Sequence, residues 1–160
     1  MNAVIIISAK YLFLVSLGAF AAYLVYLWLK SKPEFLSVVR LSLLSLPLSY
    51  LAGKIASHLF YNPRPFVSEH LVPLIPHVPD NGFPSDHALL TMTVAAIVFA
   101  ADKKLGMALF AIATLVGTAR ILAHLHHPLD IIGSSAIAIA STGVSYLILP
   151  QLTKLARRSH

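Results

Sequence analysis

The sequence predicts an all-α membrane protein, a polytopic bundle of about five transmembrane helices, and three observations support this class. First, the 160-residue chain is 58% hydrophobic and only 11% charged, whereas soluble domains are about 45–50% apolar and about 25% charged. Second, its apolar residues form five long runs. Third, its basic residues gather between alternate runs. No linker or repeat divides the chain, so residues 1–160 are expected to form a single membrane-embedded domain.

The five apolar runs are the expected membrane spans, since a helix needs about 20 residues to cross a bilayer. The first run has no basic residue before Lys10 and is too long for a signal-peptide core, so it is expected to be a retained span. The second and third reach span length only by including polar residues near one end. The runs cover residues 3–29, 35–60, 84–101, 105–123 and 129–149.

The distribution of basic residues predicts the orientation of the bundle. The connections 30–34 and 102–104 and the segment after Pro150 are rich in lysine and arginine, whereas the other connections contain only Arg64. The positive-inside rule therefore predicts an outside N-terminus and a cytoplasmic C-terminus in a cytoplasmic membrane. The bias accounts for most of the net charge of +6. The cations form no aromatic-interleaved basic face, so nucleic acid is not an expected partner. The absence of cysteine excludes disulfides and thiolate metal sites.

The loop 61–83 is long for a membrane bundle and contains five prolines, an apolar middle and the turn signal Asn81-Gly82. It is expected to lie in the membrane interface or to fold over the mouth of the bundle.

Ionisable residues gather where four of the spans reach the predicted outer side. Three cations with few acids nearby, Lys54, Arg64 and Arg120, suit an anion with several oxygens, such as phosphate. The start of the helix near Ser85 adds backbone N–H donors. Histidines can supply a nucleophile and an acid. The full set is Lys54, His58, Arg64, Asp86, His87, Arg120, His124, His126, His127 and Asp130. It predicts phosphoryl transfer through a phosphohistidine.

Structural interpretations of the same residues remain open at this point. Ser85 and Asp86 can cap the helix that follows them and complement its dipole, and Arg120 and Asp130 can form a structural ion pair. A metal site is a further alternative, although Pro128 disfavours helix at His127 and nearby arginines repel cations. Its ligands would be His124, His126, His127 and Asp130. Among the remaining histidines, His58, His70 and His77 are interpreted as loop or interface residues, with Glu69 and His70 as candidate headgroup contacts.

Three motifs resemble the type 2 phosphatidic acid phosphatase superfamily over roughly residues 50–135. They are Lys54 with Arg64-Pro65, then Pro84-Ser85-Asp86-His87, then Arg120 with His126 and Asp130. The strings RPF (64–66) and FPSDH (83–87) resemble the bacitracin-resistance subfamily of undecaprenyl-diphosphatases. Three departures stand out. Nine residues rather than the usual six separate Lys54 from Arg64, so that Ser57 occupies the usual lysine position. In addition, Asp86 replaces Gly, and Ala119 replaces Ser.

The resemblance implies roles for seven residues and a reaction without a metal or other cofactor. His126 would be the nucleophile, Asp130 would orient it, and His87 would be the general acid. The phosphoryl oxygens would be bound by Lys54, Arg64, Ser85 and Arg120. The implied activity is hydrolysis of undecaprenyl diphosphate to undecaprenyl phosphate at the outer face of the membrane, as in peptidoglycan precursor recycling and bacitracin resistance. The alternatives are phosphatidic acid or phosphatidylglycerol phosphate as substrate, or a non-catalytic lipid-phosphate binder or transporter, which needs the cations but not His126 with Asp130.

Overall fold

A computed structural model describes residues 2–158, with side chains described up to residue 151. The side chains of Lys154, Arg157 and Arg158 and the whole of His160, part of the predicted cytoplasmic tail, lie outside the described set. The described residues form helices and no strand, which confirms the all-α prediction. The helices are α1 (Asn2–Lys30), α2 (Lys32–Leu59), α3 (Pro65–Ser68), α4 (Asp86–Ala101), α5 (Lys103–Leu122) and α6 (Pro128–Arg158).

The long helices coincide with the predicted spans. Among the described residues, α1, α2, α5 and α6 are long and apolar enough to cross a membrane. The remaining long helix, α4, corresponds to the third predicted span. It has 16 residues and is therefore about 24 Å long, which is somewhat shorter than the hydrocarbon core of a bilayer. Helix α6 continues beyond the predicted boundary at Leu149 and contains Pro150. Inside a helix, proline lacks the N–H for one backbone hydrogen bond, and its ring crowds the carbonyl four residues earlier.

Helix α4 is the centre of the bundle and packs against α1, α2, α5 and α6. Most of its residues are buried, because a helix that is apolar on every face belongs inside a bundle. Gly106 of α5 lets α4 approach closely, since a Cβ there would lie 2.3 Å from the Cα of Phe99. The other long helices expose large apolar side chains such as Leu29, Leu43 and Leu147. This outward apolar surface is that of a multi-pass membrane protein.

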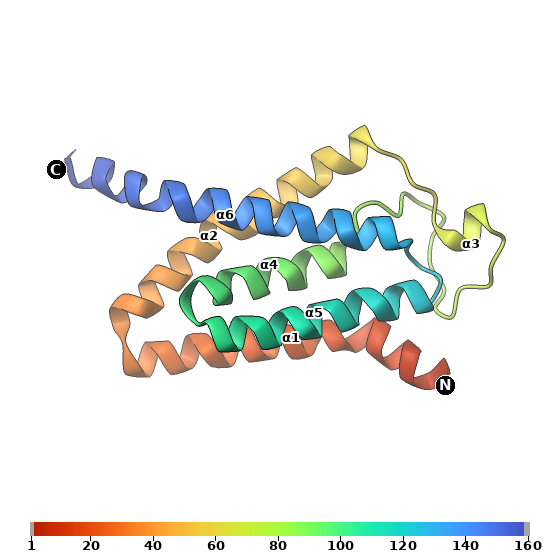
Figure 1. Cartoon of the computed structure of the whole chain (residues 1–160), viewed down its shortest axis with the longest axis horizontal. Coiled ribbons are helices and arrows are strands. Elements are labelled where there is room, and N and C mark those ends of the chain that lie inside the picture. Colours follow the sequence, from red (N-terminus) through yellow and green to blue (C-terminus); the bar gives the residue numbers. More distant parts are fainter. Residues whose placement is uncertain (1, 159–160) are drawn as a thin grey trace.

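The connections alternate between the two ends of the bundle (Figure 1). The start of α1, the loop 61–83 and the connection between α5 and α6 lie at one end, which we call the loop end. The α1–α2 and α4–α5 connections and the end of α6 lie at the other. Consequently the last turns of α2 and α5 and the first turns of α4 and α6, which carry the candidate site residues, all meet at the loop end.

The loop 61–83 folds over this end of the bundle, one of the two arrangements expected from its sequence. The backbone N–H of Leu74 donates to the carbonyl of Ala123 at 3.1 Å. Ile75 is buried in a cluster with Ala9, Ala119 and Leu125. Although the loop contains five prolines, one short helix, α3, forms within it. The loop thereby becomes a wall of the site below.

Candidate active site

A cavity of about 360 Å³ opens at the loop end, between α2, α4, α5 and the loop 61–83. Five of the seven predicted site residues line it: Lys54, Arg64, His87, Arg120 and His126. The other two, Ser85 and Asp130, are fully buried and do not line it. The remaining lining residues are Gly53, Ser57, His77, Asp80, Asn81, Phe83, Pro84 and Asp86.

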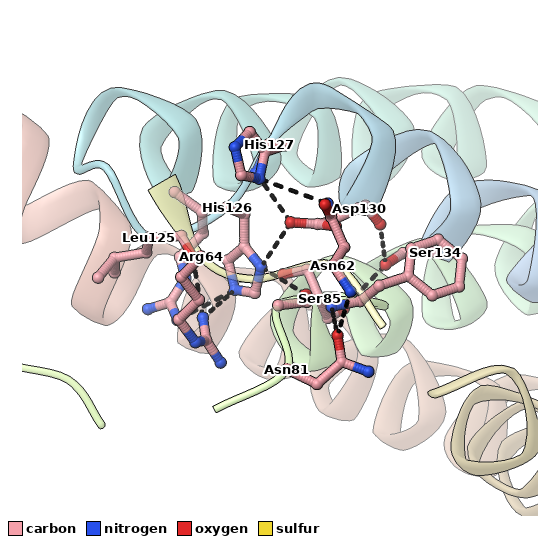
Figure 2. Close-up of polar contacts among 12 residues, drawn as sticks. Asn62, Arg64, Asn81, Ser85, Leu125, His126, His127, Asp130 and Ser134 are labelled. Carbon is pink, nitrogen blue, oxygen red and sulfur yellow. Dashed lines mark hydrogen bonds and ion pairs between the residues drawn. The ribbon is translucent and has the colours of Figure 1, made fainter. Parts of the chain in front are cut away.

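The imidazole of His126 is held with its two nitrogens in different surroundings (Figure 2). Its Nδ1 lies 2.9 Å from the carbonyl oxygen of Gly82 and 3.4 Å from Oδ2 of Asp130. Both groups are acceptors at neutral pH, so Nδ1 carries the hydrogen. Nε2 then carries no hydrogen, and its lone pair accepts from Nη1 of Arg64 at 3.2 Å and from Nη2 of Arg120 at 3.5 Å. A nucleophilic nitrogen therefore faces two guanidinium groups.

Asp130 is fully buried at the start of α6, and its carboxylate has several donors around it. Oδ1 accepts from Nδ2 of Asn62 at 2.7 Å, and Oδ2 accepts from the backbone N–H of His127 at 2.8 Å. The carbonyl of Gly82 is closer to the imidazole of His126 than this carboxylate is. The alternative of an Arg120–Asp130 ion pair is wrong, since no such pair occurs among the described residues.

Arg64 is fixed in extended backbone (φ −65°, ψ 153°) between Pro63 and Pro65, as its neighbours predict. Its buried guanidinium donates from Nε to Oδ1 of Asp80 at 2.6 Å and from Nη1 to the carbonyl of Leu125 at 2.9 Å. Burial raises the pKa of the Asp80 carboxyl, but the hydrogen bond and charge of Arg64 outweigh it and lower that pKa overall. Asp80 is therefore ionised and holds the arginine in place.

Two buried polar atoms at the site have no hydrogen-bond partner in the described part of the chain: Nε of Arg120 and Oγ of Ser85. Ser85 occupies the N-cap position of α4, yet its hydroxyl makes no capping hydrogen bond, so the capping interpretation of this side chain is wrong. Leaving a buried donor unpaired costs about 1–3 kcal/mol. Arg120 lines the cavity and Ser85 lies between the lining residues Pro84 and Asp86, so a ligand with several oxygens is a candidate partner for both groups.

Lys54 and His87 lie at the cavity wall with few protein partners. The ammonium of Lys54 lies 5.2 Å from the centroid of the Tyr50 ring, and no described side chain forms an ion pair with it. The half-buried ring of His87 makes an edge contact with Phe13, with centroids 4.7 Å apart. Lys54 thus reaches the cavity despite its unusual spacing from Arg64.

The histidines of the alternative metal site face different protein groups. Nδ1 of His124 lies 2.9 Å from the carbonyl oxygen of Val72, and Nε2 of His127 lies 3.1 Å from Oε1 of Glu69. Within residues 2–158 no group of three or more His, Asp or Glu side chains is arranged to hold a metal ion. The metal site suggested by these histidines and Asp130 therefore does not assemble in the described residues.

Several residues at the site were not predicted from the sequence, and all of them lie in the loop or beside it. His77 lies in the loop, as expected, and also lines the cavity, whereas Glu69 and His70 do not line it. Asn62 and Asp80 hold Asp130 and Arg64. In the sequence, Gly82 stands out only as part of the turn signal Asn81-Gly82. A Cβ there would lie 3.1 Å from both the carbonyl of Asn62 and Oδ2 of Asp130, so only glycine fits without displacement.

The electrostatic surroundings keep the His126 imidazole neutral. Burial is the largest cause, and together with the positive charges of Arg64 and Arg120 it lowers the pKa of His126, although the hydrogen bond that its Nδ1–H donates to Asp130 acts in the opposite direction. A neutral imidazole has its Nε2 lone pair available for attack. Two guanidinium groups beside that nitrogen can bind the oxygens of a phosphoryl group and stabilise the charge that develops on them.

Comparisons with known proteins identify a family for this chain. Residues 38–154 match the PAP2 superfamily. Bacitracin transport permease protein BcrC of Bacillus licheniformis is 29% identical over 155 residues, which cover 96% of this chain and 74% of that protein. Undecaprenyl-diphosphatase BcrC of Bacillus subtilis is 31% identical over 125 residues, covering 76% of this chain and 63% of that protein.

A third relative and a solved structure extend the comparison. The putative undecaprenyl-diphosphatase YbjG of Escherichia coli is 31% identical over 111 residues, covering 68% of this chain and 56% of that protein. The chain thus spans less than two thirds of the length of two of these three relatives. The crystal structure of Aquifex aeolicus LpxE matches with a TM-score of 0.73 at 24% identity, covering 91% of this chain and 87% of that one. The two proteins share a fold.

Proposed function

Since the chain belongs to the PAP2 superfamily and is a membrane lipid phosphatase, we propose that it hydrolyses undecaprenyl diphosphate to undecaprenyl phosphate and inorganic phosphate. Residues 1–160 act as one membrane-embedded phosphatase domain in this proposal. The substrate assignment is supported by the relatives described as undecaprenyl-diphosphatases and by a polar cavity at one end of an apolar bundle. A polyprenyl tail can stay in lipid while its diphosphate enters that cavity.

The observation that carries the proposal is the environment of His126 Nε2. This nitrogen is unprotonated because Nδ1 faces two acceptors, and it lies within 3.5 Å of two guanidinium groups. A terminal phosphoryl group bound by Arg64 and Arg120 would therefore have its phosphorus in front of the lone pair. Placing the reacting atoms in this way removes much of the entropic cost of the reaction.

In the first step Nε2 of His126 attacks the terminal phosphorus, and the bond between that phosphorus and the bridging oxygen breaks. The bridging oxygen leaves with the polyprenyl phosphate and takes a proton from His87. The imidazole then carries the phosphoryl group on Nε2 and keeps its hydrogen on Nδ1. Its positive charge is stabilised by Asp130, which lies 3.4 Å away, and by the carbonyl of Gly82 at 2.9 Å.

In the second step water attacks the phosphohistidine. His87 accepts a proton from that water, the P–Nε2 bond breaks, and inorganic phosphate leaves the cavity. Throughout both steps the donors to the phosphoryl oxygens are Lys54, Arg64, Arg120 and Ser85. This role gives the two unpartnered buried groups, Arg120 Nε and Ser85 Oγ, a ligand that would satisfy them.

We further propose that the protein lies in the cytoplasmic membrane with its N-terminus outside. The connections at the loop end contain Arg64 but no other lysine or arginine, while Lys30, Lys32, Lys103 and Lys104 lie at the helix ends beside the two short connections opposite. The positive-inside rule then places the cavity on the extracytoplasmic side.

The experiment that tests this function is phosphate release from undecaprenyl diphosphate by the detergent-purified protein in the presence of EDTA. Release at rates unaffected by EDTA is expected, because every proposed step uses side chains of the chain. Parallel assays with phosphatidic acid and phosphatidylglycerol phosphate compare the alternative substrates. A His126→Gln variant that still turns over the lipid would contradict the nucleophile assignment. Lipid binding without turnover by the wild-type protein would indicate a binder or transporter.

A further inference from the structure

We propose that His77 forms a second phosphate subsite in the cavity, which binds the non-reacting phosphoryl group of a diphosphate substrate. The inference rests on the proposed function and adds to it a residue that determines specificity for diphosphates over monophosphates.

The loop holds His77 at the cavity wall through anchors on both sides of it. On one side Ile75 is buried in the cluster with Ala9 and Leu125. On the other side Asp80 accepts from Nε of Arg64 at 2.6 Å. The His77 side chain between these anchors is 26% exposed and lines the cavity. Two anchors within a few residues of it restrict where its imidazole can go.

The imidazole of His77 turns one nitrogen to the protein. Its Nδ1 lies 3.3 Å from the carbonyl oxygen of Val78 and 4.0 Å from Oδ1 of Asp80, and both of these atoms are acceptors. Nδ1 therefore carries the hydrogen in the neutral ring. Nε2 has no hydrogen-bond partner among the described residues. It is the nitrogen available to a ligand in the cavity.

Because of the charges around His77, binding of an anion would favour protonation of its imidazole. Burial is the largest cause of its lowered pKa, followed by the positive charge of Arg64, with Arg120 acting in the same direction and Asp80 opposing them. The other charged or titratable groups that line the cavity are Lys54, Asp86, His87 and His126. A bound diphosphate offsets the positive charge of both arginines, so Nε2 can take a proton from solvent and donate it in a hydrogen bond.

In the proposed reaction, Arg64 and Arg120 both bind the reacting phosphoryl group. Their guanidinium groups converge on Nε2 of His126, where the terminal phosphorus must sit. The second phosphoryl group of a diphosphate lies on the far side of the bridging oxygen and needs its own donor. His77 contributes an additional nitrogen on the loop wall of the same cavity. A monophosphate has no second phosphoryl group, so it gains nothing from this residue.

The test compares kcat/KM for farnesyl diphosphate and farnesyl monophosphate, which share one tail, in the wild-type protein and in His77→Gln. The variant should lose about 10-fold or more on the diphosphate, the range expected for one hydrogen bond to a charged group, mainly through a higher KM. On the monophosphate the change should be less than about 2-fold. His70→Gln is the matched control, since His70 lies on the same loop, is exposed and does not line the cavity.

Equal losses on both substrates, or no loss on either, would overturn the proposal. A wild-type protein that hydrolyses only the monophosphate would overturn the diphosphate assignment itself, and that result is visible without any variant. If His77→Gln does not fold, the second subsite can be tested by comparing inhibition of the wild-type protein by inorganic diphosphate and by inorganic phosphate. Inorganic diphosphate should then compete at a concentration about 10-fold below that of inorganic phosphate, and equal inhibition constants would contradict a second subsite.

Discussion

At the scale of single residues, the chemistry depends on how the two nitrogens of one imidazole are separated. A backbone carbonyl from the loop and a buried carboxylate from α6 hold Nδ1 of His126, and arginines from the loop and α5 face Nε2. A histidine in an apolar sequence can be a buried structural residue or a catalyst. What favours catalysis here is that its unprotonated Nε2 faces a cavity lined with cations.

The lowered pKa of His126 predicts the acid limit of activity. Below its pKa the imidazole is protonated and has no lone pair at Nε2, so activity falls as the pH falls. Because burial and the two arginines lower that pKa from its ordinary value of 6.5, the acid limb of kcat/KM should lie below pH 6.5. The measurement is kcat/KM as a function of pH, which reports the groups of the free enzyme. An acid limb above pH 6.5 would contradict the assigned surroundings.

Replacing Asp130 by Asn should lower kcat by about 10²-fold, in the range seen when one electrostatic contact to a transition state is lost. The tautomer of His126 should survive, because Gly82 remains the closer acceptor. The variant should also be less stable, because an amide cannot accept from both Asn62 and His127 as the carboxylate does. Steady-state kinetics and thermal unfolding measure the two effects.

Asp102→Asn is the matched control for that substitution. Asp102 caps α5 at the opposite end of the bundle by accepting from the N–H of Leu105 at 3.0 Å, and asparagine is an equally good N-cap. Neither kcat nor the melting temperature should change in this variant. If the Asp130→Asn variant behaved like the control, Asp130 would have no part in orienting or stabilising His126.

At the scale of elements, the loop 61–83 turns a set of helix ends into a closed site. It supplies Arg64, Asp80 and Gly82 and packs Ile75 against the bundle. Asn62, in the same loop, connects it to the start of α6 by donating a hydrogen bond to Asp130. Positions that hold the catalytic groups therefore lie far from them in sequence.

Gly82→Ala should lower both activity and stability. The new methyl group would lie 3.1 Å from the carbonyl of Asn62 and from Oδ2 of Asp130, so the loop or the carboxylate must move and the carbonyl that holds His126 moves with it. Gly18→Ala is the control, because no atom lies within 4 Å of a Cβ there, and alanine favours a helix by about 0.5–1 kcal/mol. Phosphatase activity and thermal unfolding of both variants measure this. Unchanged activity in Gly82→Ala would exclude a role for this loop carbonyl.

The sequence predicts the helices of this protein but not the contacts that its loop makes. The helices follow from long apolar runs, and five of the seven predicted site residues line the cavity because charged groups in apolar spans are costly and stand out. The contacts of Asn62 with Asp130 and of Gly82 with His126 join positions 68 and 44 residues apart. They depend on irregular backbone that has no periodicity, so neither hydropathy nor motif spacing could reveal them. For the same reason the sequence shows His77 only as a loop residue and does not reveal its place in the cavity wall.

At the scale of the whole molecule, the two ends of the bundle differ in charge and in chemistry. The loop end contains the cavity, and the helix ends on the opposite side carry the lysines at positions 30, 32, 103 and 104. This asymmetry predicts which end faces the cytoplasm.

The chain has no cysteine, so single-cysteine variants can test this orientation cleanly. Val72, which is 80% exposed on the loop, should react as Val72→Cys with a membrane-impermeant maleimide in intact cells. Lys104→Cys, at the opposite end, should react only after the membrane is permeabilised. The reverse pattern would place the cavity on the cytoplasmic side and contradict the proposed orientation.

The assignment of His126 as the nucleophile is tested most directly by asking whether His126 becomes phosphorylated. The wild-type protein would be mixed with undecaprenyl diphosphate labelled in its terminal phosphate, quenched within milliseconds, and digested for mass spectrometry. We expect a label on His126 that is labile in acid and stable in alkali, as for a phosphorus–nitrogen bond, and no label in His126→Gln. Labelling at another residue, or rapid turnover with no phosphoprotein at any quench time, would contradict nucleophilic attack by His126.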